Sequence, residues 1–201
     1  PPSARGLSER PATLPVFTKL SSGIGMISVP DFTSHNPEAM TAFSAAGHMI
    51  FAQAPDMRGW IVDLRGDQGG NMWAMLGILK PLLGSGDLGV FEDRTGQRSR
   101  PWRAEIQGSG QVQATGPDLA RVPVAVLIGP QTASAGEAVA IALKGRPQTR
   151  FFGRATHGQT TGNTTFTLPD GGMLALATEH ECDRRGQCYE GPGQPDDVQA
   201  D

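Results

Sequence analysis

Ser134 is the residue of this sequence best placed to act as a nucleophile. It follows the apolar segment 122–129 and lies in the small-residue stretch Thr-Ala-Ser-Ala-Gly-Glu, after which the apolar spacing becomes helical. A serine at a helix start commonly caps the helix by accepting a backbone N–H. A turn after a parallel strand, however, lies at the carboxyl edge of the sheet, where α/β proteins bind ligands. The helix N-terminus would also offer N–H groups to an oxyanion, so we interpret Ser134 as a nucleophile.

A second turn with chemical potential follows the apolar segment 59–64. Its sequence, Arg-Gly-Asp-Gln-Gly-Gly, ends in the pair Gly69 and Gly70. Backbone N–H groups of such a pair can point at a bound carbonyl, whereas a tight turn with an Asp63–Arg65 ion pair is the structural alternative. The turn does not match a phosphate-binding loop, because it lacks both Gly-x-Gly-x-x-Gly and a following lysine.

The serine turn departs from two common nucleophile motifs. Thr132 stands where the Gly-x-Ser-x-Gly elbow has its first glycine, and Glu137 stands where Ser-x-x-Lys has its lysine. Neither motif therefore identifies the general base that a serine nucleophile needs.

The elements that must position these turns alternate between strands and helices. Apolar runs predict the strands, and apolar residues at helical spacing predict the helices. The predicted strands are 23–30, 59–64, 122–128 and 149–153, and the predicted helices are 37–54, 71–81 and 135–144. This alternation predicts an α/β fold with a largely parallel sheet.

Two further segments do not follow the alternation. Residues 84–121 are polar and glycine-rich, which predicts an excursion of hairpins or loops away from the core. Residues 164–178 predict a hairpin that turns at Asp170-Gly171-Gly172.

Length and composition limit the classes of function. The 201 residues suffice for one well-buried domain, with 38% hydrophobic residues and a net charge of −3. The absence of a basic run argues against nucleic acid as a partner. No apolar run approaches the roughly 18 residues that a membrane span needs. The loop-like start without Met leads us to expect that segment 1–22 continues from an upstream region and that residues 23–201 form the core domain.

Cys182 and Cys188 are the only cysteines. They flank a segment that predicts a turn, so a disulfide between them would close a small hairpin and indicate an exported protein. Two reduced thiols in a cytoplasmic protein are the alternative. A zinc site that adds His180 has the wrong ligand spacing.

Three motifs taken together resemble a known family. They are Gly-Trp-Ile-Val-Asp-Leu-Arg-Gly-Asp-Gln-Gly-Gly at 59–70, the stretch 124–143 around Ser134, and Phe-Phe-Gly-Arg-Ala-Thr-His-Gly-Gln-Thr-Thr-Gly at 151–162. In this order they are similar to the C-terminal processing (tail-specific) serine peptidases, nearest to the nisin-resistance-protein-like branch. The resemblance covers residues 23–198 and implies a crotonase-like or ClpP-like α/β core.

The resemblance implies a mechanism through an acyl-enzyme, without a metal or an organic cofactor. Ser134 would be the nucleophile, and the oxyanion hole would combine the N–H of Ala135 with one from Gly69 or Gly70. Asp67 departs from the pattern, since family members often carry asparagine at this place.

The base is the main departure from the family. Many members place a catalytic lysine in the substrate loop where this chain has Gln159, and none of its lysines fits that role; they are Lys19, Lys80 and Lys144. The nisin-resistance-like branch uses a histidine from a segment upstream of strand 23–30. We therefore expect the base to be a histidine upstream of Pro1.

Internal histidines are the alternative source of the base. His157 is the best of them, because its loop should pass close to Ser134. His48 lies on the polar side of its predicted helix, which indicates a surface position. His180 follows a strand beside the cysteines and could complete a Ser–Asp–His order with Asp170, but the chain lacks the nucleophile elbow that accompanies this order.

We predict a serine peptidase that cleaves peptides or protein tails, with an extended peptide bound along an exposed strand. The alternative is a non-catalytic binding module of the same fold, because the retinoid-carrier modules of interphotoreceptor retinoid-binding protein also resemble this family. A crotonase-type enzyme acting on acyl-CoA is a second alternative, weakened because such enzymes need no serine in this turn.

Overall fold

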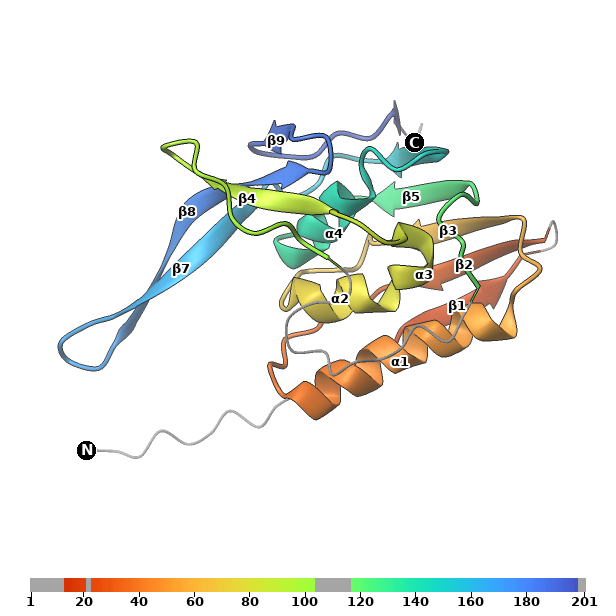
Figure 1. The fold of residues 1–201 in the computed structure, drawn as a ribbon, viewed down its shortest axis with the longest axis horizontal. Helices are drawn as coiled ribbons and strands as arrows, with labels where there is room; N and C mark the ends of the chain where they lie inside the picture. Colours follow the sequence, from red (N-terminus) through yellow and green to blue (C-terminus); the bar gives the residue numbers. More distant parts are fainter. Residues whose placement is uncertain (1–12, 21–22, 104–116, 199–201) are drawn as a thin grey trace.

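The computed structural model describes residues 13–20, 23–103 and 117–198. Its main sheet has the strand order β1-β2-β3-β5-β6-β10 (Figure 1). From β2 to β10 all neighbours run parallel, and only β1 is antiparallel to its neighbour. The strands are β1 (Val16–Lys19), β2 (Ile24–Ser28), β3 (Gly59–Asp63), β5 (Val124–Ile128), β6 (Thr149–Gly153) and β10 (Asp197–Val198). Because β1 precedes residue 23, the sheet begins within the segment 1–22.

The helices lie on one side of this sheet (Figure 1). In the described residues they are α1 (Pro37–Gln53), α2 (Met72–Ile78), α3 (Lys80–Leu83) and α4 (Ala135–Leu143). The Asn36 side chain caps α1 by accepting two backbone N–H groups. Each predicted strand–helix unit is present, so the prediction of an α/β fold with a largely parallel sheet is confirmed.

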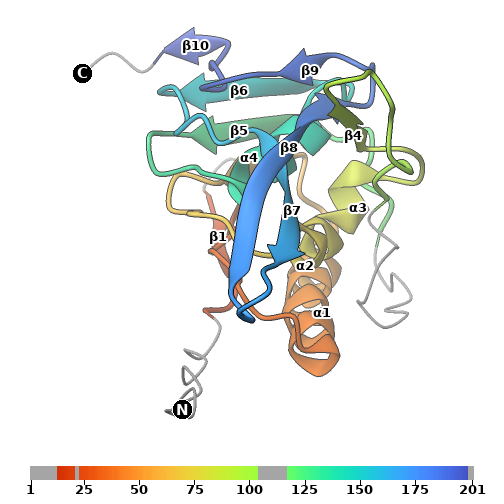
Figure 2. The ribbon, with the colours of Figure 1, turned by 90° about the vertical axis from the view of Figure 1, so that its left-hand side faces the viewer.

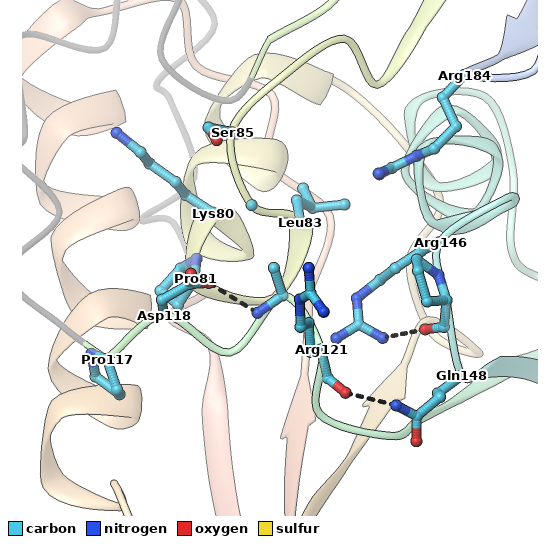
Figure 3. Close-up of a pocket in the computed structure, with 13 residues that line it drawn as sticks. Lys80, Pro81, Leu83, Ser85, Pro117, Asp118, Arg121, Arg146, Gln148 and Arg184 are labelled. Carbon is cyan, nitrogen blue, oxygen red and sulfur yellow. Dashed lines mark hydrogen bonds between the residues drawn. The ribbon is translucent and has the colours of Figure 1, made fainter.

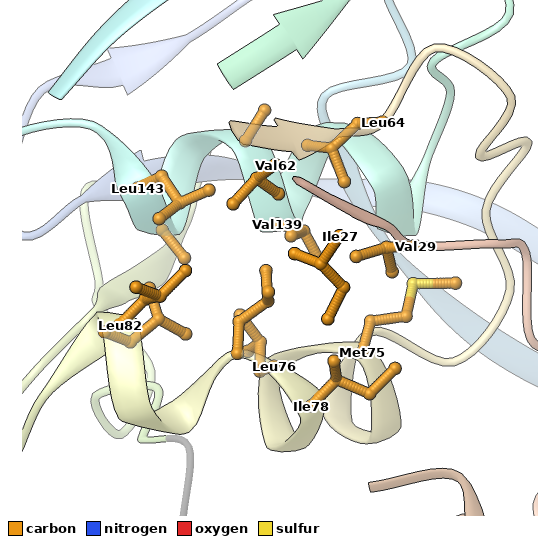
Figure 4. Packing of buried hydrophobic residues seen from close by; sticks show 14 of the residues in the cluster. Ile27, Val29, Val62, Leu64, Met75, Leu76, Ile78, Leu82, Val139 and Leu143 are labelled. Carbon is orange, nitrogen blue, oxygen red and sulfur yellow. The ribbon is translucent and has the colours of Figure 1, made fainter. Parts of the chain in front are cut away.

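A continuous apolar core fills the space between sheet and helices (Figure 4). Buried side chains from the sheet side meet those of three helices; they are Ile27, Val29, Val62 and Leu64, facing Met75, Leu76, Ile78, Leu82, Val139 and Leu143. Removing such apolar surface from water contributes about 25 cal/mol per Å² to the free energy of folding. This burial is the main contribution that holds the serine turn and the glycine turn at one edge of the sheet.

Polar and small residues mediate the close contact between α1 and α2. A Cβ added to Gly47 would lie 2.4 Å from Cγ2 of Ile78, so the helix backbones approach closely. His48 is 4% exposed, and its Nε2 lies 2.8 Å from the Gly77 carbonyl oxygen. The predicted surface position of His48 is therefore wrong, because its polar neighbours on α1 face α2 rather than water. Burial lowers the pKa of His48, which favours the neutral ring.

A second sheet stands beside the first (Figure 2). Its strands are β4 (Gly89–Asp93), β7 (Thr161–Thr167), β8 (Met173–Asp183) and β9 (Cys188–Tyr189). Strands β7 and β8 form the predicted late hairpin, which projects as an arm with Phe166 paired to Leu174. Phe166 is 45% exposed and Leu174 is 42% exposed, so one face of the arm presents apolar side chains to solvent.

The segment 84–121 is only partly an excursion. Strand β4 pairs with β8 as part of the second sheet. Leu88 and Trp102 are both 0% exposed and belong to the core. The prediction that the whole segment leaves the core is therefore wrong, because two large apolar residues anchor it; residues 104–116 of the segment lie outside the described residues.

Cys182 and Cys188 form a disulfide that joins β8 to β9. The two residues are direct partners across the antiparallel pair, as a bridged hairpin requires. In the described ranges we find no helix that is long and apolar enough to cross a membrane.

Candidate active site

The two turns singled out in the sequence meet at the carboxyl edge of the main sheet. Strands β3 and β5 are parallel neighbours, so the turns that follow them lie side by side. A Cβ added to Gly69 would lie 2.9 Å from Cβ of Ser134 and 3.2 Å from the nitrogen of Ala135. Only a glycine can make this approach, which explains the residue type at position 69.

Thr132 holds the two turns together. Its Oγ1 donates to the Leu64 carbonyl at the end of β3, with an O···O distance of 2.8 Å, and accepts from Gly129 N at 3.1 Å. The side chain is 0% exposed. Thr132, which replaces the first glycine of the Gly-x-Ser-x-Gly pattern, therefore links the ends of the neighbouring strands β3 and β5 through hydrogen bonds.

Ser134 has a strained backbone. Its φ of 50° and ψ of −119° lie outside the regions that residues with a side chain normally adopt. Such a conformation costs about 1–3 kcal/mol and is typical of functional sites. A serine on a strained strand-to-helix turn is also how nucleophile elbows expose their hydroxyl. The conformation appears here although Thr132 replaces the first glycine of that motif; the second glycine is present as Gly136.

Glu137 organises the segments around Ser134, and the sequence reasoning missed this role. Its carboxylate is 1% exposed. Oε2 accepts the N–H of Ser134 at 3.1 Å and of Gln159 at 2.6 Å, while Oε1 accepts the N–H of Gly158 at 2.9 Å. The Thr156 hydroxyl also donates to Oε1. The available signal was the Ser-x-x-Glu spacing of a capping box.

The loop of residues 154–160 therefore lies beside Ser134, as the sequence predicted for His157 and Gln159. The His157 N–H donates to the Thr132 carbonyl oxygen at 2.9 Å. The side chains of His157 and Gln159 are exposed. Among the described residues, no histidine or lysine side chain forms a hydrogen bond with Ser134.

The predicted oxyanion donors differ in their availability. The Gly69 N–H donates to Oδ1 of Asp67 at 2.9 Å, so it is already occupied. Within the part of the chain that the structure describes, the N–H groups of Gly70 and Ala135 donate to no protein acceptor. The candidate oxyanion hole therefore consists of the backbone N–H groups of Ala135 and Gly70.

Asp67 lies directly beneath this hole. It is 0% exposed, and its backbone oxygen accepts the N–H of Ala133 at 3.0 Å. Burial raises the pKa of the Asp67 carboxyl to about 8, opposed by the hydrogen bond from Gly69 and increased further by the nearby Asp31. The carboxyl is thus largely protonated at neutral pH.

Across the described ranges, one group of possible metal ligands converges, formed by Glu92, Cys182 and Cys188. The two sulfur atoms are bonded to each other, so they offer no thiolate to a cation. This group is also remote in sequence from the serine turn, and it does not fit a metal centre.

A cavity of about 660 Å³ opens at the amino edge of the sheet, away from Ser134 (Figure 3). Arg121, Arg146 and Arg184 line it. Arg146 uses its guanidinium to bind four backbone carbonyls and the Thr149 hydroxyl; the carbonyls belong to Leu82, Leu119, Val122 and Pro147. Its role is therefore to hold chain segments together.

Comparison with known proteins agrees with this arrangement. Residues 23–200 match the family model described as peptidase family S41. The chain belongs to peptidase family S41. The S41 match includes the serine turn, the glycine turn and the loop 154–160, which are the segments that converge in the structure.

Two curated proteins are similar to this S41 chain. It is 31% identical over 180 residues to the nisin-resistance protein of Lactococcus lactis subsp. lactis, a match that covers 85% of this chain and 55% of that protein. It is 28% identical over 174 residues to carboxyl-terminal-processing peptidase 2, chloroplastic, of Arabidopsis thaliana, covering 87% of this chain and 31% of that protein. The chain therefore spans about half or less of these relatives.

A solved structure shows the same fold. A lipoprotein from Streptococcus agalactiae superposes with a TM-score of 0.83 at 30% identity. The match covers 94% of this chain and 66% of the lipoprotein. The S41 core described above is thus a part that these proteins share.

Proposed function

We propose that this chain is the catalytic core of a serine peptidase that cleaves peptides or protein tails through an acyl-enzyme on Ser134. The observation that carries the proposal is the contact of Gly69 with Ser134 and Ala135 at the sheet edge. It brings a strained serine, a helix N-terminus and a glycine turn to one place. Membership of a peptidase family supports the same function.

In the proposed reaction, a general base removes the hydroxyl proton as Ser134 Oγ attacks a peptide carbonyl. The N–H groups of Ala135 and Gly70 stabilise the oxyanion of the tetrahedral intermediate; losing one such donor typically costs about 3 kcal/mol of barrier. The protonated base then gives its proton to the leaving amine, and water hydrolyses the ester.

The base in this proposal is a histidine from outside the 201 residues, as the resemblance to the nisin-resistance-like branch implies. His157 is the alternative, because its backbone is fixed beside the serine turn by the Thr132 carbonyl. A histidine base predicts a rate that rises with pH around the ordinary imidazole pKa of about 6.5.

We also propose that the protein is exported. The disulfide between Cys182 and Cys188 supports this location, since such bonds persist in oxidising compartments. The similarity to a streptococcal lipoprotein supports it as well.

The function is tested with a fluorophosphonate probe, which labels activated serines, applied to the protein that includes its upstream segment. We expect labelling of the native protein and none of Ser134→Ala, with the exposed Ser85→Ala as the matched control. The 201-residue chain and its His157→Ala variant, assayed in parallel, locate the base. Equal labelling of native protein and Ser134→Ala would rule out the nucleophile, and no labelling of either would favour a binding module.

A further inference from the structure

Asp67 is the side chain that links the two halves of the candidate oxyanion hole. Its Oδ1 accepts the N–H of Gly69 in the glycine turn. On its other side it packs against α4, where a Cβ added to Gly136 would lie 2.9 Å from Cγ of Asp67 and 3.0 Å from its Oδ1. A movement of this carboxyl would therefore displace the turn relative to the helix N-terminus.

The second oxygen of the carboxyl has no partner. Oδ2 of Asp67 is buried and makes no hydrogen bond to any residue that the structure describes. A buried acceptor oxygen that lacks a donor is costly for a carboxylate, and less so for the hydroxyl of a neutral acid. The geometry thus fits the protonated group.

The charged groups around Asp67 offer it no compensation. From the β2–α1 segment, Asp31 adds a negative charge. In the same turn as Asp67, the Arg65 guanidinium is bound to Asp63, with Nη2 and Oδ2 2.8 Å apart. On α4, the Glu137 carboxylate accepts the N–H groups of Ser134, Gly158 and Gln159 and offers Asp67 no positive charge. Ionised Asp67 would therefore be a buried charge beside the negative charge of Asp31.

We propose that Asp67 acts as a neutral carboxylic acid that positions the oxyanion turn, and that its ionisation switches the site off in alkaline solution. This inference rests on the proposed peptidase function. A charge on Asp67 would lie beside the place where the transition state develops its own negative charge, and like charges repel strongly in a site shielded from water. Asp67 is a positioning residue, since it acts through Gly69.

Asp67→Asn separates the neutral group from the ionisable one. An asparagine keeps an acceptor oxygen for Gly69 and cannot ionise. In the native full-length protein, kcat for a peptide substrate should fall above about pH 8, by about tenfold for each further pH unit. In Asp67→Asn this alkaline limb should be absent. The exposed Asp56→Asn is the matched control and should keep the limb.

Asp67→Ala, compared with Asp67→Asn, tests whether the hydrogen-bond acceptor at this position holds the glycine turn in place. It removes the acceptor for Gly69, so kcat should fall at every pH by at least tenfold while KM changes little. Asparagine at the same position should restore most of that loss. If Asp67→Asn shows the native alkaline limb, or is as impaired as Asp67→Ala, the proposal is wrong.

Infrared spectroscopy tests the protonation without relying on catalysis. At pH 6.5 the native protein should show a protonated-carboxyl band that Asp67→Asn lacks and that disappears near pH 8. Glu181 is another buried carboxyl with a raised pKa. Subtracting the spectrum of Asp67→Asn from that of the native protein removes the band of Glu181. Absence of that band in the difference spectrum overturns the proposal. Its presence in a protein without turnover would refute the peptidase function alone.

Discussion

At the scale of single residues, the candidate site depends on the backbone conformation of Ser134 and on the carboxylate of Glu137. Ser134 is held in a strained conformation. The Glu137 carboxylate accepts hydrogen bonds from backbone N–H groups of the serine turn and of the loop 154–160. A hydroxyl alone would not be positioned for attack. The backbone around it must be fixed by interactions strong enough to offset the strain.

The strain at Ser134 predicts an unusual stability order. Ser134→Gly should relieve the conformation, while Ser134→Ala retains it, so the glycine variant should be more stable than the alanine variant by about 2 kcal/mol or more. At an ordinary N-cap without strain, glycine exceeds alanine by only about 1 kcal/mol. Urea denaturation of both variants measures the difference. A difference of about 1 kcal/mol or less would contradict the strained backbone.

Glu137→Gln should loosen the loop that lies beside Ser134. An amide offers one acceptor oxygen in place of two, so at least one of the N–H groups of Ser134, Gly158 and Gln159 loses its partner. We expect at least a tenfold fall in kcat and faster amide exchange at Gly158 and Gln159. Hydrogen exchange followed by mass spectrometry measures this. The exposed Glu190→Gln serves as control, and unchanged exchange in Glu137→Gln would refute the role.

At the scale of elements, the close approach of α1 and α2 depends on glycine. Gly47→Ala would place a methyl group 2.4 Å from Ile78 Cγ2 and 2.9 Å from its Cα, so the helices must separate. We expect a loss of about 1–3 kcal/mol in the free energy of unfolding. The exposed Ala42→Ser on the same helix should cost about 0.5 kcal/mol or less. A urea titration of both variants checks the prediction, which fails if the two losses are equal.

The strands and helices could be predicted because their signal is local. Apolar runs such as 59–64 and the helical spacing of 37–54 depend only on neighbouring residues. The burial of His48 and Trp102 could not be read in this way, because each depends on a partner element distant in the sequence. The same holds for Glu137, whose donors come from residues about twenty positions further along. The sequence indicated both turns of the site, and long-range hydrogen bonds completed it.

At the scale of the whole molecule, the carboxyl and amino edges of the main sheet have different roles. The carboxyl edge holds the serine and glycine turns. At the amino edge, Arg146 binds carbonyls from segments before β4 and before β5. Burial, together with the nearby Arg184, lowers the pKa of Arg146 to about 10, so the guanidinium stays charged at neutral pH.

Arg146→Ala should be strongly destabilising. It would leave several buried carbonyl oxygens without a donor, at a cost of about 3 kcal/mol or more in the free energy of unfolding. Arg150→Ala is the matched control, because its partner Asp197 is exposed and such pairs are worth about 1 kcal/mol or less. Thermal and urea unfolding measure both. Similar losses in the two variants would show that Arg146 is dispensable to the fold.

The order of the segments along the chain bears on when the protein becomes able to act. The glycine turn, the serine turn and the loop 154–160 are made in that sequence, and Glu137 needs the amides of Gly158 and Gln159 before its hydrogen bonds are complete. A chain still emerging from the ribosome therefore carries Ser134 without its surroundings. Translation itself delays assembly of the site until almost the whole core has been synthesised.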